Sequence, residues 1–328
     1  MEQRLLTGLQ PSGRLTIGNY CGGINQVIRY QELYDTFLFV PDMHSITVPQ
    51  DPSVLPKRVI EAVGLYLACG VDPNKCHIFV QSDNLYHANL SWIFECHTYF
   101  GELSRMHQFK EKSKNKQNFT CGLFTYPILM AADILLYDAK YVPTGSDQKQ
   151  HVELARNIAE RFNNRYKKDC FIVPEPLIPK IGAKIRDLVH PEKKMSKSSD
   201  NPKASVFLLD SEKDIRKKIM SAQTDCESVI KFDEDNKPGI SNLLTLYSVF
   251  GGCTIEDAES KFSNAGYGDL KKEVANVLIE KISNIQDNYH RIISSGIIYD
   301  ILNQGKQYTN QIAAEKYNQI KRIVGFEY

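Results

Sequence analysis

The sequence has little that would place it in a membrane or in an oxidising compartment. No apolar run approaches the roughly 18 residues needed to cross a bilayer, and residues 1–10 lack the charged-then-apolar pattern of a signal peptide. None of the eight cysteines forms a CxxC pair, so neither a zinc ribbon nor an iron–sulfur site is indicated. We therefore expect no membrane association, free buried thiols and a cytoplasmic location.

An excess of one charge is missing, and so are two common nucleotide-binding fingerprints. The net charge of +1 gives no dominant basic field for nucleic acid, although a local basic face stays open. The first glycine-rich stretch is neither GxGxxG nor GxxxxGK[ST], which excludes a P-loop ATPase. What is present, 328 residues with a hydrophobic fraction of 42%, suffices for a sizeable core and for two domains.

Short apolar runs and helical periods alternate in the first half of the chain. Runs typical of strands occur at residues 4–9, 36–40 and 76–81. A helix is expected from about Gly18, and another between residues 53 and 70 with Gly70 just past its end. The apolar face of the first helix is expected to hold Ile24, Val27, Ile28 and Tyr34. This alternation favours a parallel sheet with helices on both faces, so we predict a Rossmann-type α/β fold over residues 1–205.

The middle of the chain carries more specific expectations. Residues 106–118 are polar and lysine-rich, which predicts a mobile loop, and a buried helix is expected to open near Pro127. In the next helix Asp147 is expected to be the N-cap, with Gln150 completing a capping-box-like pair. The buried stripe of that helix should hold Val152, Ala155, Ile158, Ala159 and Phe162. Trp92, the only tryptophan, is interpreted as a core residue.

Beyond about Asn201 strand signals fade and long helical periods take over. These periods are marked by Leu270, Val274, Val277, Ile282, Ile285 and Tyr289, and then by Ile312, Tyr317, Ile320 and Val324. We therefore predict an all-helical C-terminal domain over residues 206–328.

The first motif, GLQPSGRLTIGNYCGG, links the first strand to the first helix. Gly8 and Gly13 permit backbone shapes barred to other residues, and Gly18 lets a ligand approach the main chain. Backbone N–H groups at a helix start, together with the Asn19 amide, suit an anion such as phosphate. A tight strand-to-helix connection without a ligand is the alternative interpretation.

The second motif is the lysine-serine run PEKKMSKSSDNP. Lys194 and Lys197 are mobile point charges that suit a polyphosphate whose charge shifts during reaction. Ser196 and Ser198 can donate hydrogen bonds, and Met195 offers an adaptable apolar contact for a base. The alternative is a solvated basic turn.

Both motifs resemble those of a known family. KMSKS at residues 194–198 is the signature loop of class I aminoacyl-tRNA synthetases, and TIGN at residues 16–19 stands where that class carries HIGH. Thr16 and Asn19 replace the two histidines, as they do in the tryptophanyl branch. The strings GLQPSGRLTIGNY, LMAADILLYDA, VPTGSDQKQHVELARNIAERFN and KPGISNLL resemble the same branch, in order along the whole chain.

The resemblance implies that the chain activates L-tryptophan with ATP and Mg²⁺ and transfers it to tRNA(Trp), releasing pyrophosphate and AMP. The implied ATP contacts are Gln10, Pro11, Ser12, Gly18, Asn19, Gly145, Ser146, Asp147, Ile185, Lys194, Met195, Ser196, Lys197 and Ser198. The implied catalytic residues are Thr16, Asn19, Lys112, Lys194, Ser196 and Lys197, although Lys112 can equally be a solvated lysine. No metal-ligating side chain is implied, because Mg²⁺ would come with the ATP phosphates.

Selectivity for tryptophan is implied to rest on Asp133, since indole offers one N–H donor and needs an acceptor. From the residues alone, a salt bridge or a helix-interior hydrogen bond is the alternative for this carboxylate in an apolar helix. Tyr126 and Gln148 resemble the residues that hold the ammonium group. The implied pocket also includes Gly8, Gln10, His44, Met130 and Val142, of which Met130 and Val142 can be ordinary core and His44 a loop histidine.

The resemblance further implies a homodimer in which one tRNA bridges two subunits and the helical domain binds the anticodon. The basic pairs Lys217-Lys218 and Lys271-Lys272 can meet phosphates or simply be solvated helix faces. Two other functions stay open: a tyrosyl-tRNA synthetase of the same fold, and a catalytically silent RNA-binding paralogue.

Overall fold

The computed structural model describes most of the chain. The described residues are 3–8, 11, 14–113 (for Lys112 the backbone alone), 118–145, 148–177, 185–196, 199 and 201–327. Within these ranges no helix is long and apolar enough to cross a membrane.

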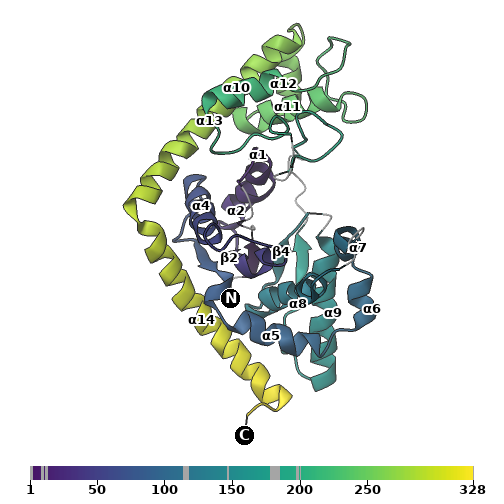
Figure 1. Cartoon of the computed structure of the whole chain (residues 1–328), viewed down its shortest axis with the longest axis vertical. Coiled ribbons are helices and arrows are strands. Elements are labelled where there is room, and N and C mark those ends of the chain that lie inside the picture. The colour runs from purple at the N-terminus through teal and green to yellow at the C-terminus, as the bar shows by residue number, and fades with distance from the viewer. Residues whose placement is uncertain are drawn as a thin grey trace.

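Five parallel strands in the described part of the chain form one sheet, in the order β3–β2–β1–β4–β5 (Figure 1). They are β1 (Arg4–Gly8), β2 (Asp35–Val40), β3 (Cys76–Val80), β4 (Tyr141–Pro143) and β5 (Glu175–Leu177). Strand order reverses beside β1, because the chain returns from the β3 edge to place β4 on the other side of β1. In such sheets ligands bind at the carboxyl ends of the strands where the order reverses.

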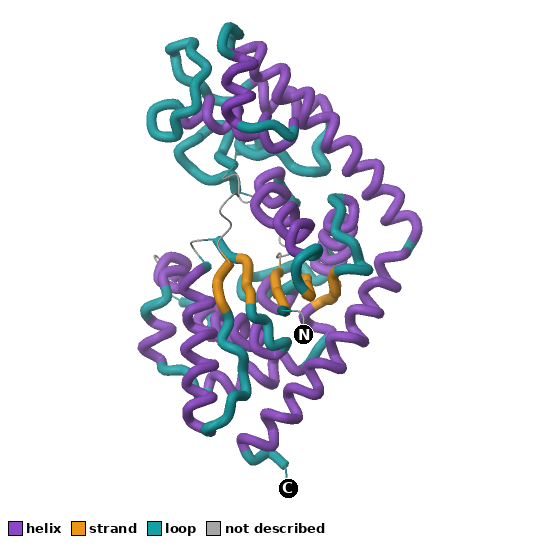
Figure 2. Tube along the Cα trace, turned by 180° about the vertical axis from the view of Figure 1, so that it is seen from behind, coloured by secondary structure: helices purple, strands orange, loops and turns teal. Residues whose placement is uncertain are grey.

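Helices cover both faces of the sheet, as the sequence predicts (Figure 2). The sheet-flanking helices include α2 (Asn25–Tyr30), α4 (Leu55–Ala68), α5 (Tyr86–Glu95), α8 (Cys121–Leu136) and α9 (Lys149–Tyr166). Alternate residues of β2 enter different cores: Leu38 packs with α2 and α4, whereas Phe37 and Phe39 pack with α5, α8 and α9. A strand buried on both faces needs the continuous apolar run seen in the sequence.

The first helix is broken into three pieces. These are α1 (Ile17–Asn19), the π-helical turn η1 (Tyr20–Ile24) and α2. The expected place of Tyr34 on this helix is wrong, because α2 ends at Tyr30 and Tyr34 lies in the turn before β2. By contrast α4 ends as predicted, with Gly70 two residues past Ala68 at φ +112°.

The expected loop at residues 106–118 is wrong for its first part. Residues His107–Ser113 form α7, which follows α6 (Phe100–Ser104). Phe109, the one aromatic residue in this polar stretch, packs against Phe119 and Phe124 at ring-centroid distances of 5.1 and 4.9 Å. One anchored ring holds the short helix to its neighbours, a contact that composition does not reveal.

Two helix starts also differ from expectation. Helix α8 begins at Cys121, where the Thr120 hydroxyl accepts the N–H of Leu123 at 3.3 Å, so Pro127 lies inside the helix. Helix α9 begins at Lys149 after Gln148, and the side chain of Gln150 accepts the N–H of His107 at 2.8 Å instead of capping its own helix. The expected cap Asp147 lies outside the described residues. The predicted stripe of α9 is confirmed, because all five of its residues are buried.

Trp92 is not a core residue. Its side chain is 63% exposed on α5, although the neighbouring Ile93 and Phe94 are buried. The eight cysteines are free as expected, but only Cys21, Cys76 and Cys170 are buried.

The second half of the chain is helical, as predicted. Its helices are α10 (Glu212–Met220), α11 (Pro238–Gly251), α12 (Ile255–Phe262), α13 (Tyr267–Ser295) and α14 (Ile297–Val324). Gly296, at φ +73°, joins α13 to α14, and the two long helices run down one side of the molecule (Figure 1). The remaining short elements are α3 (Asp42–Ser45) and the 3₁₀ turn η2 (Gln81–Asp83).

Helix α14 returns to the sheet. A Cβ at Gly305 would lie 1.8 Å from the carbonyl oxygen of Ile78 in β3, so only glycine permits this approach. One buried cluster also joins Ile17, Val206 and Leu278 across the expected domain boundary. The two domains expected from the sequence therefore share a core in this structure, and the boundary at residue 205 stays a prediction.

Candidate active site

The TIGN segment forms a closed capping box at the carboxyl side of β1. The Thr16 hydroxyl accepts the N–H of Asn19 at 3.3 Å, and Asn19 Oδ1 accepts the N–H of Thr16 at 2.9 Å. Both side chains thus fix the start of the helix, and Thr16 is 1% exposed. Gln10 and Ser12 lie outside the described residues, whereas Pro11 is described and buried.

The structure brings the two motifs into contact. A Cβ on Gly18 would lie 3.7 Å from Met195 Cβ and 3.8 Å from Ile185 Cβ, so the helix start, the expected adenine contact and the signature loop converge. The Met195 N–H donates to the Ile185 carbonyl at 3.0 Å, and Lys194 bridges Arg186 in antiparallel fashion. Ile185 and Met195 are buried, whereas Lys194 and Ser196 are exposed.

This pairing leaves the Lys194 side chain at the surface, next in sequence to Met195, which packs against Gly18. Of the other predicted nucleotide contacts after β4 and in the signature loop, only some lie within the described residues. Gly145 follows β4 and is exposed, which puts it at the sheet edge where the order of strands reverses. Ser146, Asp147, Lys197 and Ser198 lie outside the described residues, and so does the side chain of Lys112, whose backbone belongs to α7.

Asp133 is fully buried in α8 and accepts three hydrogen bonds. His44 Nε2 lies 2.8 Å from its Oδ2, while His87 Nδ1 and Gln81 Nε2 each lie 2.7 Å from its Oδ1. Burial alone would raise the pKa of Asp133, but the hydrogen bonds and charges of His44 and His87 lower it to about 2. The carboxylate is therefore ionised at neutral pH, and it is a pure acceptor.

His87 extends this arrangement away from the sheet edge. Its Nε2 lies 2.9 Å from the Tyr137 hydroxyl, which in turn accepts the Asn84 side-chain amide at 2.9 Å. His87 is 0% and Asn84 1% exposed. Since each carboxylate oxygen has two acceptor positions, Oδ2, with His44 bound, retains capacity for one further donor.

A second polar group, the Tyr126 hydroxyl, lies on the same helix, about two turns before Asp133. The Tyr126 hydroxyl donates to Gln108 Oε1 at 3.1 Å and lies 2.9 Å from His151 Nε2. Burial raises the pKa of Tyr126 to about 12, so the phenol keeps its proton at neutral pH. The His44 ring stands edge-on to the Tyr126 ring at a centroid distance of 6.2 Å.

The other predicted pocket residues surround these two groups. Val142 is buried in β4, Met130 is half-buried in α8, and Gln148 is half-buried at the start of α9. A Cβ on Gly8 would lie 2.7 Å from the Phe39 ring, so the end of β1 has no space for a side chain. The structure thus places Tyr126, Met130 and Asp133 on one helix, His44 in α3 after β2, and Val142 within β4.

Several polar partners were not predicted from the sequence. They are Gln81, His87, Gln108, His151 and Asn242. Asn242 of α11 accepts the N–H of Arg186 at 2.9 Å and donates to its carbonyl at 3.1 Å, which pins the segment beside Ile185. Only the position of Gln81 and His87 after a buried strand could have signalled them, because sheet ends gather polar groups.

Two of the lysines considered for tRNA phosphates point inward. Lys218 Nζ lies 2.6 Å from Asp210 Oδ2, and Lys271 Nζ donates to the Ala222 carbonyl at 2.8 Å.

In the described ranges, no group of three or more His, Cys, Asp and Glu side chains is arranged to hold a metal ion.

Residues 1–282 match the model of a protein family described as "tRNA synthetases class I (W and Y)". The chain belongs to this family of class I tRNA synthetases. This synthetase is 52% identical over 323 residues to a tryptophan–tRNA ligase of Caldanaerobacter subterraneus subsp. tengcongensis, covering 98% of each chain.

Solved structures agree with the placement of this class I synthetase. It superposes on the tryptophanyl-tRNA synthetase of Mycoplasma pneumoniae with a TM-score of 0.91 at 36% identity, covering 99% of this chain and 98% of the other. The tryptophanyl-tRNA synthetase of Campylobacter jejuni, complexed with ADP and tryptophan, superposes with a TM-score of 0.84 at 33% identity. The match covers 98% of this chain and 100% of the other.

Proposed function

We propose that this synthetase activates L-tryptophan with ATP to tryptophanyl-adenylate and transfers the tryptophanyl group to tRNA(Trp), releasing pyrophosphate and AMP. The observation that carries the proposal is the buried, ionised Asp133 in α8 of a member of the class I synthetase family. Two histidines and a glutamine hold this carboxylate in its ionised form, and an indole N–H is a donor that the remaining acceptor position of Oδ2 can take.

Asp133 and Tyr126 divide the work of holding the amino acid. Asp133 accepts the indole N–H, while Tyr126, with Gln148, accepts the ammonium group about one and a half to two helical turns away. Met130 and Val142 line the ring, and His44 closes it at the edge, with Gly8 and Gln10 at the end of β1. This arrangement leaves the substrate carboxylate directed at the glycine-lined turn, where ATP is held.

The nucleotide is proposed to lie beside Gly18 and Ile185. Pro11, Ser12, Asn19, Gly145 and Ser146 contact the nucleotide or its phosphates, Asp147 holds the ribose, and Met195 and Ser198 complete the site. The tryptophan carboxylate attacks the α-phosphorus in line, and charge grows on the departing pyrophosphate. Thr16 and Asn19 hold the helix start, and Lys112, Lys194, Ser196 and Lys197 stabilise that charge.

Mg²⁺ is proposed to enter with the phosphates of ATP, where it neutralises charge when bound. We assign it no protein ligand. The chain's own contribution is the set of ammonium groups, which bind the phosphates most strongly when negative charge has built up in the transition state.

Tyrosine is the alternative amino acid, and the hydrogen bonds of Asp133 argue against it. A phenol both donates and accepts, so its pocket should hold a tyrosine–aspartate pair at the ring tip. Here Asp133 is held by two histidines and a glutamine. A catalytically silent paralogue is disfavoured because the two motifs are both present and their residues Gly18, Ile185 and Met195 lie in contact.

A homodimer is proposed from an exposed apolar surface around α5 and α6. Leu85, Trp92, Tyr99 and Phe100 are 75%, 63%, 66% and 74% exposed. Leu85 and Trp92 are seven residues apart, so they share one face of the helix, opposite the face that packs on α8. Large apolar side chains gathered at the surface are typical of protein interfaces. A second copy of this chain is the occupant that the family resemblance implies.

The helical residues 206–328 are proposed to form the anticodon-binding domain, after a catalytic domain of residues 1–205. The cytoplasmic location expected from the sequence stays a prediction. ATP–pyrophosphate exchange tests the proposed function: tryptophan should support exchange far better than the other amino acids. Stronger exchange with tyrosine, or none with either, would overturn it.

A further inference from the structure

We infer that Asp210 is a positioning residue which ties the base of the signature loop to the start of α1. This inference rests on the proposed function, because the parts that Asp210 holds are the two sides of the proposed nucleotide site. The segment that transmits its effect is residues 204–210, called here the bridging segment.

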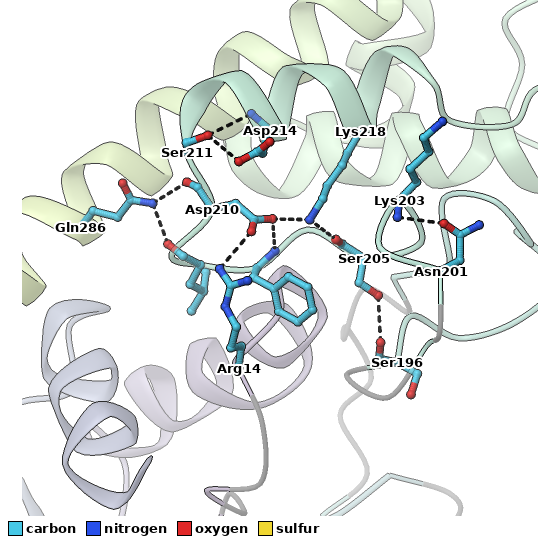
Figure 3. Close-up of polar contacts among 12 residues, drawn as sticks. Arg14, Ser196, Asn201, Lys203, Ser205, Asp210, Ser211, Asp214, Lys218 and Gln286 are labelled. Carbon is cyan, nitrogen blue, oxygen red and sulfur yellow. Dashed lines mark hydrogen bonds and ion pairs between the residues drawn. The ribbon is translucent and has the colours of Figure 1, made fainter. Parts of the chain in front are cut away.

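The bridging segment is bonded to both motifs. On one side it pairs with the helix start, since the Ile17 N–H donates to the Val206 carbonyl at 3.0 Å and the Leu208 N–H to the Leu15 carbonyl at 2.9 Å. On the other side the Ser205 hydroxyl donates to the Ser196 carbonyl at 2.9 Å (Figure 3). A shift of this short segment therefore moves both sides of the nucleotide site.

Asp210 holds the bridging segment in place. Its Oδ2 accepts the Phe207 N–H at 2.9 Å and Lys218 Nζ at 2.6 Å, and its Oδ1 accepts Arg14 Nη2 at 3.1 Å. Lys218 also donates to the Ser205 carbonyl at 2.8 Å, so a single ammonium group fixes both ends of the segment (Figure 3).

Burial makes this ion pair consequential. The side chains of Asp210 and Lys218 are 6% and 12% exposed, whereas that of Arg14 is 52% exposed. Removing one partner of a buried pair leaves the other charge uncompensated. Both cations also lie over the Phe207 ring, Arg14 at 4.6 Å and Lys218 at 4.9 Å from its centroid.

The same segment is bonded to the long helix α13. Gln286 Nε2 donates to the carbonyls of Leu208 and Asp210, each at 2.9 Å (Figure 3). Helices α10 and α13, both from the helical half, thus hold a segment that is also bonded to the helix start and to the signature loop. None of these residues needs to touch substrate to affect catalysis, because a misplacement of about 1 Å can cost about 100-fold in rate.

The test compares Asp210→Asn with wild type and a matched control. Asp225→Asn is the control, because Asp225 also pairs with a shielded lysine, Lys237, at 3.2 Å, but in a different part of the helical half. Two readouts are measured: amide hydrogen exchange over residues 14–24 and 186–196 without substrates, and single-turnover formation of tryptophanyl-adenylate alongside tryptophan affinity.

Asp210→Asn should speed hydrogen exchange in both segments, slow adenylate formation by about 10- to 100-fold and leave tryptophan affinity within about twofold. Asp225→Asn should leave exchange in both segments as in wild type, even if its melting temperature falls. Unchanged exchange in Asp210→Asn, or an equal rate loss in the control, would overturn the inference.

Ser205→Ala keeps the inference testable if Asp210→Asn does not fold. It removes only the hydroxyl that bonds Ser196, so it should speed exchange in residues 186–196 alone and slow adenylate formation in the same direction. Wild-type behaviour of this variant would count against the coupling. The hydrogen-exchange measurement needs no amino acid, so it is independent of the proposed function. A wild type that fails to activate tryptophan would contradict the proposed function. Faster exchange in both segments of Asp210→Asn would still support the positioning role.

Discussion

His87 Nδ1 lies 2.7 Å from Asp133 Oδ1, and both side chains are completely shielded from solvent. With Gln81 on the same oxygen and His44 on the other, this contact orients a carboxylate that sits inside an apolar helix. The acceptor is therefore rigid and charged before any substrate arrives, which is what discrimination by one hydrogen bond requires.

Replacing Asp133 with asparagine should remove much of the selectivity for the indole N–H. Wild type should favour tryptophan over its benzothiophene analogue, which lacks the N–H, by up to about 10⁴-fold in kcat/KM, because the analogue leaves a buried acceptor unsatisfied. In Asp133→Asn the preference should shrink by at least about tenfold. Pyrophosphate exchange with both substrates measures it, and an undiminished preference in the variant would remove Asp133 from this role.

The charge on Asp133 also makes stability depend on acid pH. Its folded pKa, about 2, lies below the ordinary aspartate value of 3.8, so the folded state binds fewer protons than the unfolded state in this range. The stabilisation, on the order of 2 kcal/mol, is fully present above about pH 4 and is lost as the pH falls toward 2. Urea unfolding of wild type and Asp133→Asn should therefore show a gap that is larger at pH 5 than at pH 3.

A widening gap on acidification would contradict the assigned direction of this pKa shift. The comparison with the variant matters because other carboxylates also titrate below pH 5. Asp35 and Glu102, for example, have pKa values lowered by ion pairs that outweigh their burial, and those contributions cancel between the two proteins.

The signature-loop lysines should act on the chemical step and not on amino-acid binding. Lys197→Ala should slow adenylate formation by about 100-fold or more, since one electrostatic donor to the developing charge is worth that much. Tryptophan affinity should stay within about twofold. Lys193→Ala is the matched control, because Lys193 is an exposed lysine four residues earlier in the sequence and outside the proposed site. Unchanged turnover in Lys197→Ala would refute the role given to this loop.

The apolar surface around α5 and α6 should be covered by a second copy of the chain. Phe100→Asp should shift the sedimentation of the protein from dimer to monomer, because a buried carboxylate at the contact is costly. Leu33→Asp is the control: Leu33 is 63% exposed but lies in the turn before β2, away from α5. Equal sedimentation of Phe100→Asp and wild type would place the contact elsewhere. Trp92 fluorescence should report the same transition.

Most of the fold could be predicted from local pattern. The continuous apolar run of β2 predicts a buried strand, and residues 36–40 are buried in the structure. The buried stripe of α9 follows directly from helical spacing. Local pattern failed where one tertiary contact decides. Helix α7 depends on Phe109 meeting two other rings, and Trp92 is exposed because α5 turns that face away from α8.

The candidate site divides in the same way. The family motifs identified Gly18, Ile185, Met195 and Asp133, and the structure places the first three in contact. The resemblance named His44, but Gln81 and His87 could not be found from sequence, because they approach Asp133 from η2 and α5, 52 and 46 residues away. Asp210 was missed for the same reason, since it lies 196 residues from Arg14.

The decisive experiment is a crystal structure of the protein with tryptophan and a non-hydrolysable ATP analogue. We expect the indole nitrogen within about 3.2 Å of an Asp133 carboxylate oxygen, with the nucleotide beside Gly18 and Ile185. An indole nitrogen that faces only apolar side chains, or a nucleotide bound away from these residues, would contradict it.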